Sequence, residues 1–431
     1  MQKIYLDRIL KRLSNLQFAI GILFTIVIII AIGTIIEQDQ STSFYQKNYP
    51  EENPILGFIS WKLLLALNLD HVYTSYWFIL LLIIFGLSLI SCTLTVQLPT
   101  LQRLRRWKFY GNLQNLRGIT NNIPINKTDT ALHHLYSQNY TIFRQGEKYY
   151  AYSGLIGRLG PVVVHMSLIL LLIGSTIGSF TGYTAQEFIP RGEVIHIQNL
   201  VKTGRLSYLP QDISYRVNDF WITYTNQSNT SQFYSDLSLI DNIGNEIKRK
   251  IIFVNEPLVY KGVTLYQTDW DIVGLKYSTN NGKIEQLPLT KIIKNGQKFW
   301  LGNIKNSENT TNLTVLCRDL SGKIYLYDTN GAIKQEFELG NTLFLDNQNK
   351  VVFSEFLTST GLQVKTDPGI KIVYLAFFFL MVSTYVSFFS YSQIWGSEKA
   401  NQTTLLGISN RAVLMFQKEF RYLIEKILGR F

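Results

Sequence analysis

Cysteine is nearly absent from this chain, whose 431 residues include only Cys92 and Cys317. Neither belongs to a Cys-x-x-Cys pair, and neither has a histidine at metal-ligand spacing. The sequence therefore gives no sign of a dithiol oxidoreductase or a cysteine-based zinc site. Phosphate-binding glycine loops are also missing, and no Ser/His/Asp grouping has a recognisable spacing. The local motifs favour none of these enzyme classes.

Charged residues are scarce as well, at 16% of the chain against 46% hydrophobic residues, with a mean hydropathy of +0.07. These values indicate a few membrane helices joined to a water-soluble domain. Four segments reach the roughly 20 apolar residues that span a bilayer: 16–36, 76–98, 159–180 and 370–389. The first follows a basic start, as a signal peptide does. Its apolar core is too long for one and no small-residue cleavage pattern follows, so we expect a retained helix.

The net charge of +11 is unevenly distributed. The long stretch 181–368 is neutral, with 19 Lys and Arg against 19 Asp and Glu. The basic excess therefore lies at the N-terminus, in 99–158 and in 390–431, whereas the short loop 38–75 is acidic. By the positive-inside rule, the basic segments lie on the cytoplasm-like side and 181–368 lies opposite. The charge reports orientation, and no nucleic-acid partner is expected.

The stretch 181–368 is predicted to be all-β. Short alternating runs recur along it, broken by turn signals such as Asn242-Ile243-Gly244. Strands at that spacing are typical of a sandwich or an open barrel. The predicted fold is thus an α-helical membrane protein with about four transmembrane helices and a large all-β extracytoplasmic domain. Its parts are a helix pair (1–98), a cytoplasm-side loop (99–158), the third span (159–180), the β domain (181–368), the fourth span (370–389) and a tail (390–431).

The tail ends in an amphipathic pattern. Basic residues separate apolar residues that recur about every 3.5 positions. The apolar residues are Val413, Phe416, Phe420, Ile424, Ile427 and Phe431. This pattern predicts a helix that lies on the membrane surface in contact with lipids. A helix that binds a partner protein is the alternative.

His165, in the third apolar segment, is the main candidate functional residue. Ionisable side chains are rare inside membrane helices, because hydrocarbon cannot solvate them. Neutral imidazole is a common axial ligand of haem iron, so a haem-binding role is one interpretation. The other is a histidine hydrogen-bonded to a neighbouring helix. His71, just before the second span, is a weaker candidate with an expected interfacial hydrogen bond. The other histidines are expected at the surface, His133 and His134 in a loop and His196 in a strand.

The third span has two distinct faces. At 100° per residue, the His165 face is shared by Pro161, Ile169, Leu172 and Thr176. The opposite face carries a small-residue ridge of Gly174, Gly178 and Gly182, which favours close helix packing. We expect packing through the glycines, with the His165 face offered to another group; a bundle that covers both faces is the alternative. His165 lies seven residues past Arg158, about 10 Å along the helix. A ligand there would enter from the cytoplasm-like side.

Several segments together resemble one family, the ResB-like or CcsB cytochrome c biogenesis proteins. The matching segments run in order along the chain: 14–38 (ending IGTIIEQ), 69–99, 154–178 (beginning GLIGRLGPVVVH), Asp236-Leu237-Ser238-Leu239, 254–260, 265–270 and Asp367-Pro368-Gly369-Ile370. The length and the separate chain look most like plastid and cyanobacterial members.

The resemblance implies half of a two-component machine, with a CcsA-type membrane protein as the other half. Such a pair conveys haem across the membrane and supports its covalent attachment to apocytochromes c. The family's membrane histidine corresponds to His165, implied as an axial ligand of b-type haem in transit, and the second ligand would come from the partner. The chain lacks the partner's tryptophan-rich motif, so it would act as a non-catalytic or co-catalytic subunit of a haem lyase.

The implied location is the plastid thylakoid membrane with the large domain in the lumen; a cyanobacterial thylakoid or plasma membrane is the alternative. Two other functions compete with haem delivery. One is an assembly scaffold that docks apocytochrome or the partner without binding haem. The other is a receptor-like sensor, but neither cytoplasm-side segment resembles a signalling module.

Overall fold

The computed structural model describes residues 2–52, 54, 57, 59–104, 107–113, 116–225, 230–280, 282–294, 296–305, 312–328, 331–344, 350–399 and 401–429. It contains two compact units. The first combines Met1–Ser175 with Lys371–Phe431, and the second is Thr176–Ile370. The second unit is therefore an insertion between two segments of the first.

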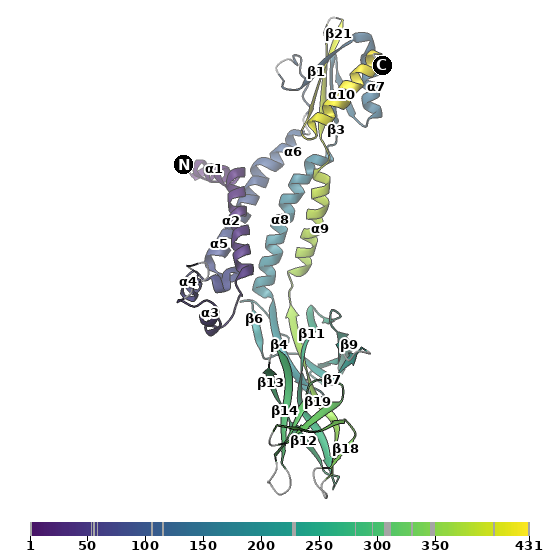
Figure 1. Cartoon of the computed structure of the whole chain (residues 1–431). Helices are drawn as coiled ribbons and strands as arrows, with labels where there is room; N and C mark the ends of the chain where they lie inside the picture. Colours follow the sequence, from purple (N-terminus) through teal and green to yellow (C-terminus); the bar gives the residue numbers. More distant parts are fainter. Residues whose placement is uncertain are drawn as a thin grey trace. The chain divides into compact units, whose positions relative to one another are not determined.

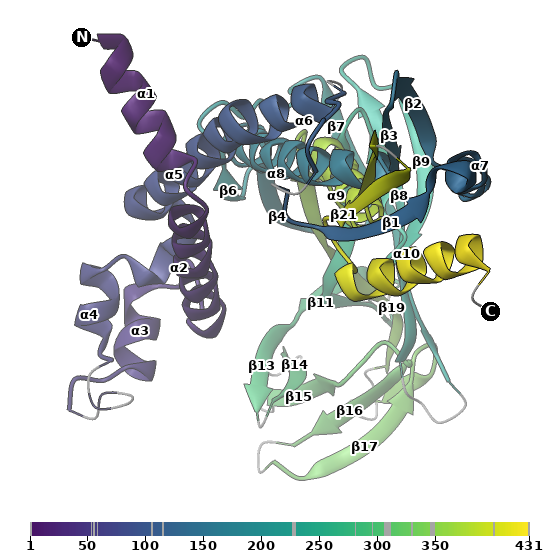
Figure 2. The ribbon, with the colours of Figure 1, turned by 90° about the horizontal axis from the view of Figure 1, so that it is seen from above.

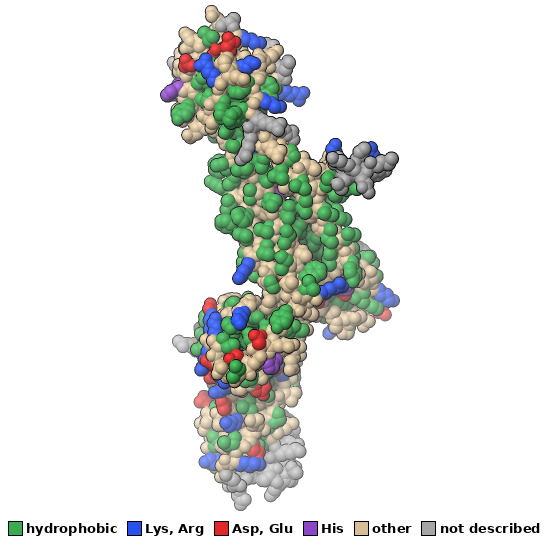
Figure 3. Space-filling model, turned by 180° about the vertical axis from the view of Figure 1, so that it is seen from behind, with side chains coloured by type: hydrophobic (Ala, Val, Ile, Leu, Met, Phe, Trp, Pro, Cys, Tyr) green, Lys and Arg blue, Asp and Glu red, His purple; other side chains and the backbone are tan. Residues whose placement is uncertain are grey.

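The first unit contains most of the helices. In chain order these are α1 (Gln2–Leu13), α2 (Leu16–Ile35), α3 (Thr42–Asn48), α4 (Trp61–Ala66), the 3-10 segment η1 (Leu69–Thr74), α5 (Tyr76–Cys92), the π turn η2 (Thr93–Gln97), α6 (Leu98–Leu104), α8 (Ile156–Thr181) and α9 (Ile370–Ser387). Four helical stretches are long and apolar enough to cross a membrane: Leu16–Ile35, Tyr76–Gln102, Ile156–Thr181 and Ile370–Ser387. Figure 3 shows many hydrophobic side chains on the surface of these helices, with few charged side chains among them. The four predicted apolar helices are confirmed.

Helices α8 and α9 run side by side (Figure 1) because glycines remove the side chains between them. A Cβ atom at Gly160 would lie 2.6 Å from the Cα of Ser387, and one at Gly174 would lie 3.0 Å from the Cγ2 of Val373. The predicted glycine ridge is thus confirmed at Gly174. It continues toward the helix start at Gly160, whereas Gly182 lies just beyond the end of α8. Such close contact lets dispersion forces act between two apolar backbones in a lipid environment.

The segments predicted as a loop (99–158) and a tail (390–431) instead form one small α+β domain. Its elements are β1 (Ile119–Pro124), the short turn η3 (Ile125–Lys127), α7 (Thr128–Ser137), β2 (Thr141–Gln145), β3 (Lys148–Ser153), β20 (Ser392–Lys399), β21 (Gln402–Ser409) and α10 (Val413–Leu428). The strands make an antiparallel sheet in the order β1-β21-β20-β3-β2. Strand β3 pairs directly with β20, so the two chain segments share one sheet.

The amphipathic helix α10 covers this sheet and does not lie on the membrane by its apolar face. Figure 2 shows α10 running beside β1 and β21. Its apolar face is buried against α7 and the strands: Phe416, Phe420, Leu423, Ile424 and Ile427. The prediction of a membrane-surface helix is wrong because the same periodicity serves a protein face or a lipid face. Phe431, the last residue of the predicted pattern, lies outside the described residues.

The second unit is the predicted large all-β domain, which is confirmed. Its strands are β4 (Tyr183–Pro190), β5 (Val194–Ile195), β6 (Leu200–Thr203), β7 (Ile213–Tyr224), β8 (Thr230–Asp241), β9 (Glu246–Phe253), β10 (Leu258–Tyr260), β11 (Val263–Thr279), β12 (Ile284–Pro288), β13 (Thr290–Lys294), β14 (Gln297–Lys305), β15 (Asn312–Cys317), β16 (Lys323–Tyr327), β17 (Ile333–Glu338), β18 (Thr342–Phe344) and β19 (Lys350–Thr366). They form three antiparallel sheets: β5-β7-β8-β9; β10-β11-β19-β4-β6 with β12 and β18 attached; and β13 to β17 in order.

Two hydrophobic cores fill this domain, and the 17-residue strands β11 and β19 contribute to both. In one core, Val217 and Leu237 of the four-stranded sheet pack against residues such as Leu362 of β19. In the other, Trp300 of the β13–β17 sheet packs with residues such as Phe353 of β19. The domain is therefore a pair of packed-sheet layers built on two shared long strands.

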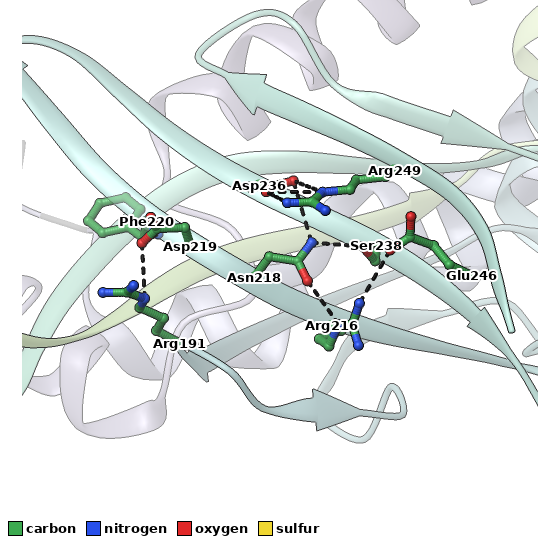
Figure 4. A network of polar contacts seen from close by, with 9 residues as sticks. All are labelled: Arg191, Arg216, Asn218, Asp219, Phe220, Asp236, Ser238, Glu246 and Arg249. Atoms are coloured by element: carbon green, nitrogen blue, oxygen red, sulfur yellow. Dashed lines mark hydrogen bonds and ion pairs between the residues drawn. The ribbon is translucent and has the colours of Figure 1, made fainter. Parts of the chain in front are cut away.

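Polar side chains link β7, β8 and β9 where β7 has a bulge between Val217 and Asp219 (Figure 4). The bulged Asn218 donates from Nδ2 to the Oγ of Ser238 over 2.7 Å and accepts from the Nε of Arg216 over 2.8 Å. On the neighbouring strand β9, Arg249 forms an ion pair with Asp236 of β8. These contacts explain the Asp236-Leu237-Ser238-Leu239 motif, in which polar side chains alternate with two buried leucines.

Candidate functional site at His165

His165 lies on the face of α8 that packs against α5. Leu168, Ile169 and Leu172 on that face pack into a cluster that includes Phe85 and Leu89 of α5. The bundle thus covers both faces of α8, with α9 on the glycine side and α5 on the His165 side. This is the alternative that the sequence left open.

The imidazole of His165 makes one hydrogen bond and leaves one nitrogen without a partner. Its ring is hydrogen-bonded to the backbone of Leu89. Its Nδ1 is buried and has no hydrogen-bond partner among the described residues. Because a backbone carbonyl can only accept, the ring donates its N–H there, and Nδ1 carries the free lone pair. Both interpretations of His165, helix contact and ligand, thus have a structural basis.

The acceptor carbonyl lies where α5 changes its winding. Thr93, the first residue of the π turn η2, donates from Oγ1 to the same Leu89 carbonyl over 2.8 Å. The N–H of Leu98 closes the π turn on the Thr93 carbonyl. Single π turns inside helices are frequent at functional sites, because they redirect the carbonyls around them. The local winding of α5 therefore helps to fix the His165 ring.

This arrangement fits a metal ligand. Ligating histidines almost always donate their other ring N–H to a carbonyl or carboxylate, which sets the tautomer and the ring orientation. His165 has that donor contact and an unprotonated nitrogen on the same ring. Since Nδ1 is buried, a ligand reaches it only when neighbouring side chains move. No group of three or more His, Cys, Asp or Glu in the described part of the chain could hold a metal. A second ligand would therefore have to come from elsewhere.

The other histidines have ordinary surroundings. His71, in η1, pairs through Nδ1 with Asp70 over 2.8 Å, and its side chain is 41% exposed. The loop predicted for His133 and His134 is wrong, because both lie in helix α7. The strand predicted for His196 is wrong, because this residue follows the end of β5, where its Nε2 lies 3.4 Å from the Oγ of Ser214. Their environments resemble the surface roles expected for them.

Arg158 served in the sequence only to mark the start of the span, and its own surroundings were not predicted. Arg158, in the first turn of α8, has a buried Nε with no hydrogen-bond partner in the described ranges. Its guanidinium lies 5.2 Å from the ring centroid of Tyr391. The available signal was its spacing of seven residues from His165, which returns an α-helix to nearly the same face.

These features define a multi-span membrane protein with an inserted β domain and one partly satisfied imidazole inside the helix bundle. The chain belongs to the ResB-like family, whose model matches residues 16–331 and 319–421. The resemblance found in the sequence is confirmed.

Similar proteins are found along almost the whole chain. A cytochrome c biogenesis protein Ccs1 of Emiliania huxleyi is 51% identical over 430 residues, covering 99% of this chain and 98% of the relative. The Ccs1 proteins of Pyropia yezoensis and Thalassiosira pseudonana are 44% and 43% identical, over 95% and 97% of this chain. These matches cover 94% and 100% of the length of the two relatives.

Proposed function

We propose that this chain is a membrane subunit of c-type cytochrome maturation. With a CcsA-type partner, it conveys haem across the membrane and supports covalent attachment of haem to apocytochromes c. The observation that carries the proposal is the end-to-end similarity to proteins named cytochrome c biogenesis protein Ccs1. No catalytic residue is proposed in this chain, so its role in attachment is non-catalytic or co-catalytic.

Haem is the cargo, and His165 is its proposed contact. His165 would hold haem through its iron, for which neutral imidazole is a usual protein ligand. The free Nδ1 of His165 supports this role, and the hydrogen bond to Leu89 would hold the ring in orientation. The partner would supply the second ligand.

The pairing of β3 with β20 supports the proposed orientation. Residues 148–153 and 392–399 share a sheet, so both lie on one side of the membrane. Along the chain, α8 follows the first of these strands, α9 precedes the second, and the large domain connects α8 to α9. The large domain would therefore lie on the opposite side, in agreement with the charge bias. We assign that side to the thylakoid lumen of a plastid, because the relatives are mostly algal; a cyanobacterial membrane is the alternative.

Protease accessibility tests this orientation. Protease added to sealed vesicles should cleave the large domain, 181–368, only when the lumenal face is outward. The small domain should be cleaved only in the inverted vesicles. Cleavage of the large domain from the cytoplasm-like side would contradict the topology and the proposed direction of haem movement.

Two substitutions at His165 test the ligand role. His165→Ala removes both the hydrogen bond and the lone pair, whereas His165→Gln retains an N–H donor for the Leu89 carbonyl but is a poor iron ligand. A haem ligand predicts loss of mature c-type cytochrome in both variants, with the protein still inserted. A purely structural histidine predicts a tolerated Gln variant, since a membrane hydrogen bond contributes only about 0.6 kcal/mol.

The control for these variants is Met166→Ala, which changes a 52% exposed side chain on the same helix. External imidazole should partly restore function to His165→Ala, because a small ligand can occupy the vacated axial position. Normal haem content and cytochrome assembly in both His165 variants would contradict haem ligation. That result would favour the scaffold function instead.

The scaffold remains the second candidate because the β domain exposes apolar side chains on β9 and just beyond it. Ile251 is 49% exposed and Val254 is 40% exposed. Such residues could contact an apocytochrome or the partner. Ile251→Lys would then impair maturation without changing haem binding, whereas His165→Gln would change haem binding.

A further inference from the structure

Arg158 and His165 form a pair of incompletely satisfied polar groups on one face of α8. The Nε of Arg158 and the Nδ1 of His165 are both buried without hydrogen-bond partners in the described residues. Seven residues separate them, which is nearly two helical turns and about 10 Å along the axis. Arg158 lies at the helix start and His165 lies deeper in the apolar span. The two side chains thus leave nearly the same face of α8, with the guanidinium near the membrane surface and the imidazole deeper inside.

A guanidinium stays charged in proteins, and its buried N–H groups normally have an acceptor. Arg158 is half-buried, and its Nε is the covered donor. The neighbour of Arg158 is instead the ring of Tyr391, at 5.2 Å. Tyr391 is 1% exposed, and its hydroxyl lies 3.2 Å from that of Tyr150. Burial raises the pKa of Tyr391, so its phenol stays neutral and cannot neutralise the guanidinium. The aromatic face holds the guanidinium without pairing its charge.

A stacked guanidinium is suited to a planar anion. The ring supports one face of the guanidinium, and the N–H groups at its edge match the two oxygens of a carboxylate. A haem molecule presents such carboxylates at one edge and iron at its centre. In a membrane the carboxylates favour the surface and the ring favours the apolar interior. The order of Arg158 and His165 along α8 matches that polarity.

We propose that Arg158 binds a carboxylate of the haem whose iron His165 ligates, and so fixes how the cargo is oriented in the bundle. This inference rests on the proposed function and adds a residue that recognises the carboxylates of haem. Arg158 is a binding residue, and it takes no part in attachment chemistry. The same guanidinium could hold a lipid phosphate, so the test separates these two anions.

The test compares haem with its dimethyl ester, which keeps the iron and the ring but lacks free carboxylates. Each is titrated by absorbance into the purified complex with the partner. The unaltered protein should bind the diacid about tenfold more tightly, the effect expected of one charge-assisted hydrogen bond. Arg158→Gln should bind both forms equally well while keeping the axial-ligand spectrum at saturation. Arg158→Lys should retain part of the preference.

Arg144→Gln is the matched control, because Arg144 also stacks on a tyrosine, at 5.1 Å from the ring of Tyr149. It should keep the full preference for the diacid. Equal binding of both haem forms by the unaltered protein overturns the proposal, and this comparison needs no variant to fold. Undiminished preference in Arg158→Gln also overturns it. The proposal is also overturned if Arg158→Gln loses only binding to anionic-lipid vesicles, because the guanidinium would then bind a lipid phosphate.

The two proposals fail separately. If His165→Gln keeps the ligand spectrum of the unaltered protein, haem ligation at His165 is wrong and the Arg158 inference falls with it. If His165→Gln loses that spectrum but the ester binds as well as the diacid, only the Arg158 inference is wrong.

Discussion

Thr128 and Thr403 share a buried hydrogen bond of 2.6 Å between their hydroxyls, although they lie 275 residues apart in the chain. Thr128 begins α7 and Thr403 lies in β21, and both side chains are almost fully buried. The bond joins two segments that the large insertion separates. We therefore expect the small domain to unfold as one unit. A substitution that destabilises its C-terminal half should also unfold its N-terminal half.

Phe420→Asp should unfold the small domain. Phe420 is 3% exposed on the sheet-facing side of α10, so a carboxylate there would be buried without a partner. The loss should exceed about 4 kcal/mol, since removing a buried Phe side chain alone costs 3–5 kcal/mol. Limited proteolysis should then cut within 119–153. Leu414→Asp, at a 77% exposed position of the same helix, should leave the domain protected. The reverse order of sensitivity would indicate that α10 leaves the sheet and binds membrane.

Gly160→Leu should separate α8 from α9. A Cβ added at this position would lie 2.6 Å from the Cα of Ser387, and backbone atoms cannot move aside as a side chain can. Overpacking of this kind costs about 1–3 kcal/mol or more, so the yield of folded protein should fall. Gly21→Leu on α2 is the control, since a Cβ there meets nothing within 4 Å. Crosslinking between cysteines placed on α8 and α9 would report the separation. Equal crosslinking in both variants would contradict the close contact.

The large domain should lose stability in acid through Asp236. The hydrogen bonds from Arg249 hold the pKa of this carboxyl below its usual value. A depressed folded-state pKa stabilises the fold above the unfolded value of about 3.9. That contribution is lost as the pH falls through the folded pKa. Hydrogen exchange of β8 should therefore accelerate below about pH 4.

Asp236→Asn should accelerate exchange of β8 at pH 7 and flatten its dependence on acid. Asp212→Asn changes an exposed carboxyl in the same domain and should do neither. If Asp236→Asn keeps the full acid response, other carboxyls carry it and the assignment to this pair is wrong.

Cys317 should resist thiol reagents until the large domain unfolds. The side chain is fully buried, and burial raises the pKa of the thiol to about 12. Thiolate is the reactive form, so little of it exists at pH 8. In a Cys92→Ala background, maleimide should label the native protein very slowly and the denatured protein rapidly. Ser321→Cys, at an exposed turn, should react at once. Fast native labelling of Cys317 would show that this core opens readily.

The sequence predicted the features that depend on local composition. Uninterrupted apolar segments identified the spans, alternation identified strands such as β8, and a lone imidazole in an apolar helix singled out His165. The glycine spacing correctly predicted a close helix contact at Gly174. Each of these signals lies within one contiguous segment of the chain.

Features that depend on distant pairing were missed. Strand β3 finds its partner β20 more than 200 residues later, and no local pattern encodes that choice. The period of α10 predicted an apolar face but could not identify what covers it. Arg158 resembled a boundary charge because its neighbour Tyr391 comes from beyond the large insertion. The contact of His165 with Leu89 likewise depends on how α5 and α8 pack.

The sheet that joins two distant chain segments can form only late in synthesis. Tyr150 and Tyr391, whose hydroxyls meet in the finished sheet, are 241 residues apart. At ribosomal speeds of roughly 5–20 residues per second, β3 waits about 12–48 seconds for β20 to emerge. The wait ends only if both intervening helices have crossed the bilayer and returned the chain to its starting side. A molecule with a skipped span keeps an open strand edge, which is a target for aggregation or degradation. Closure of the sheet thus marks correct insertion.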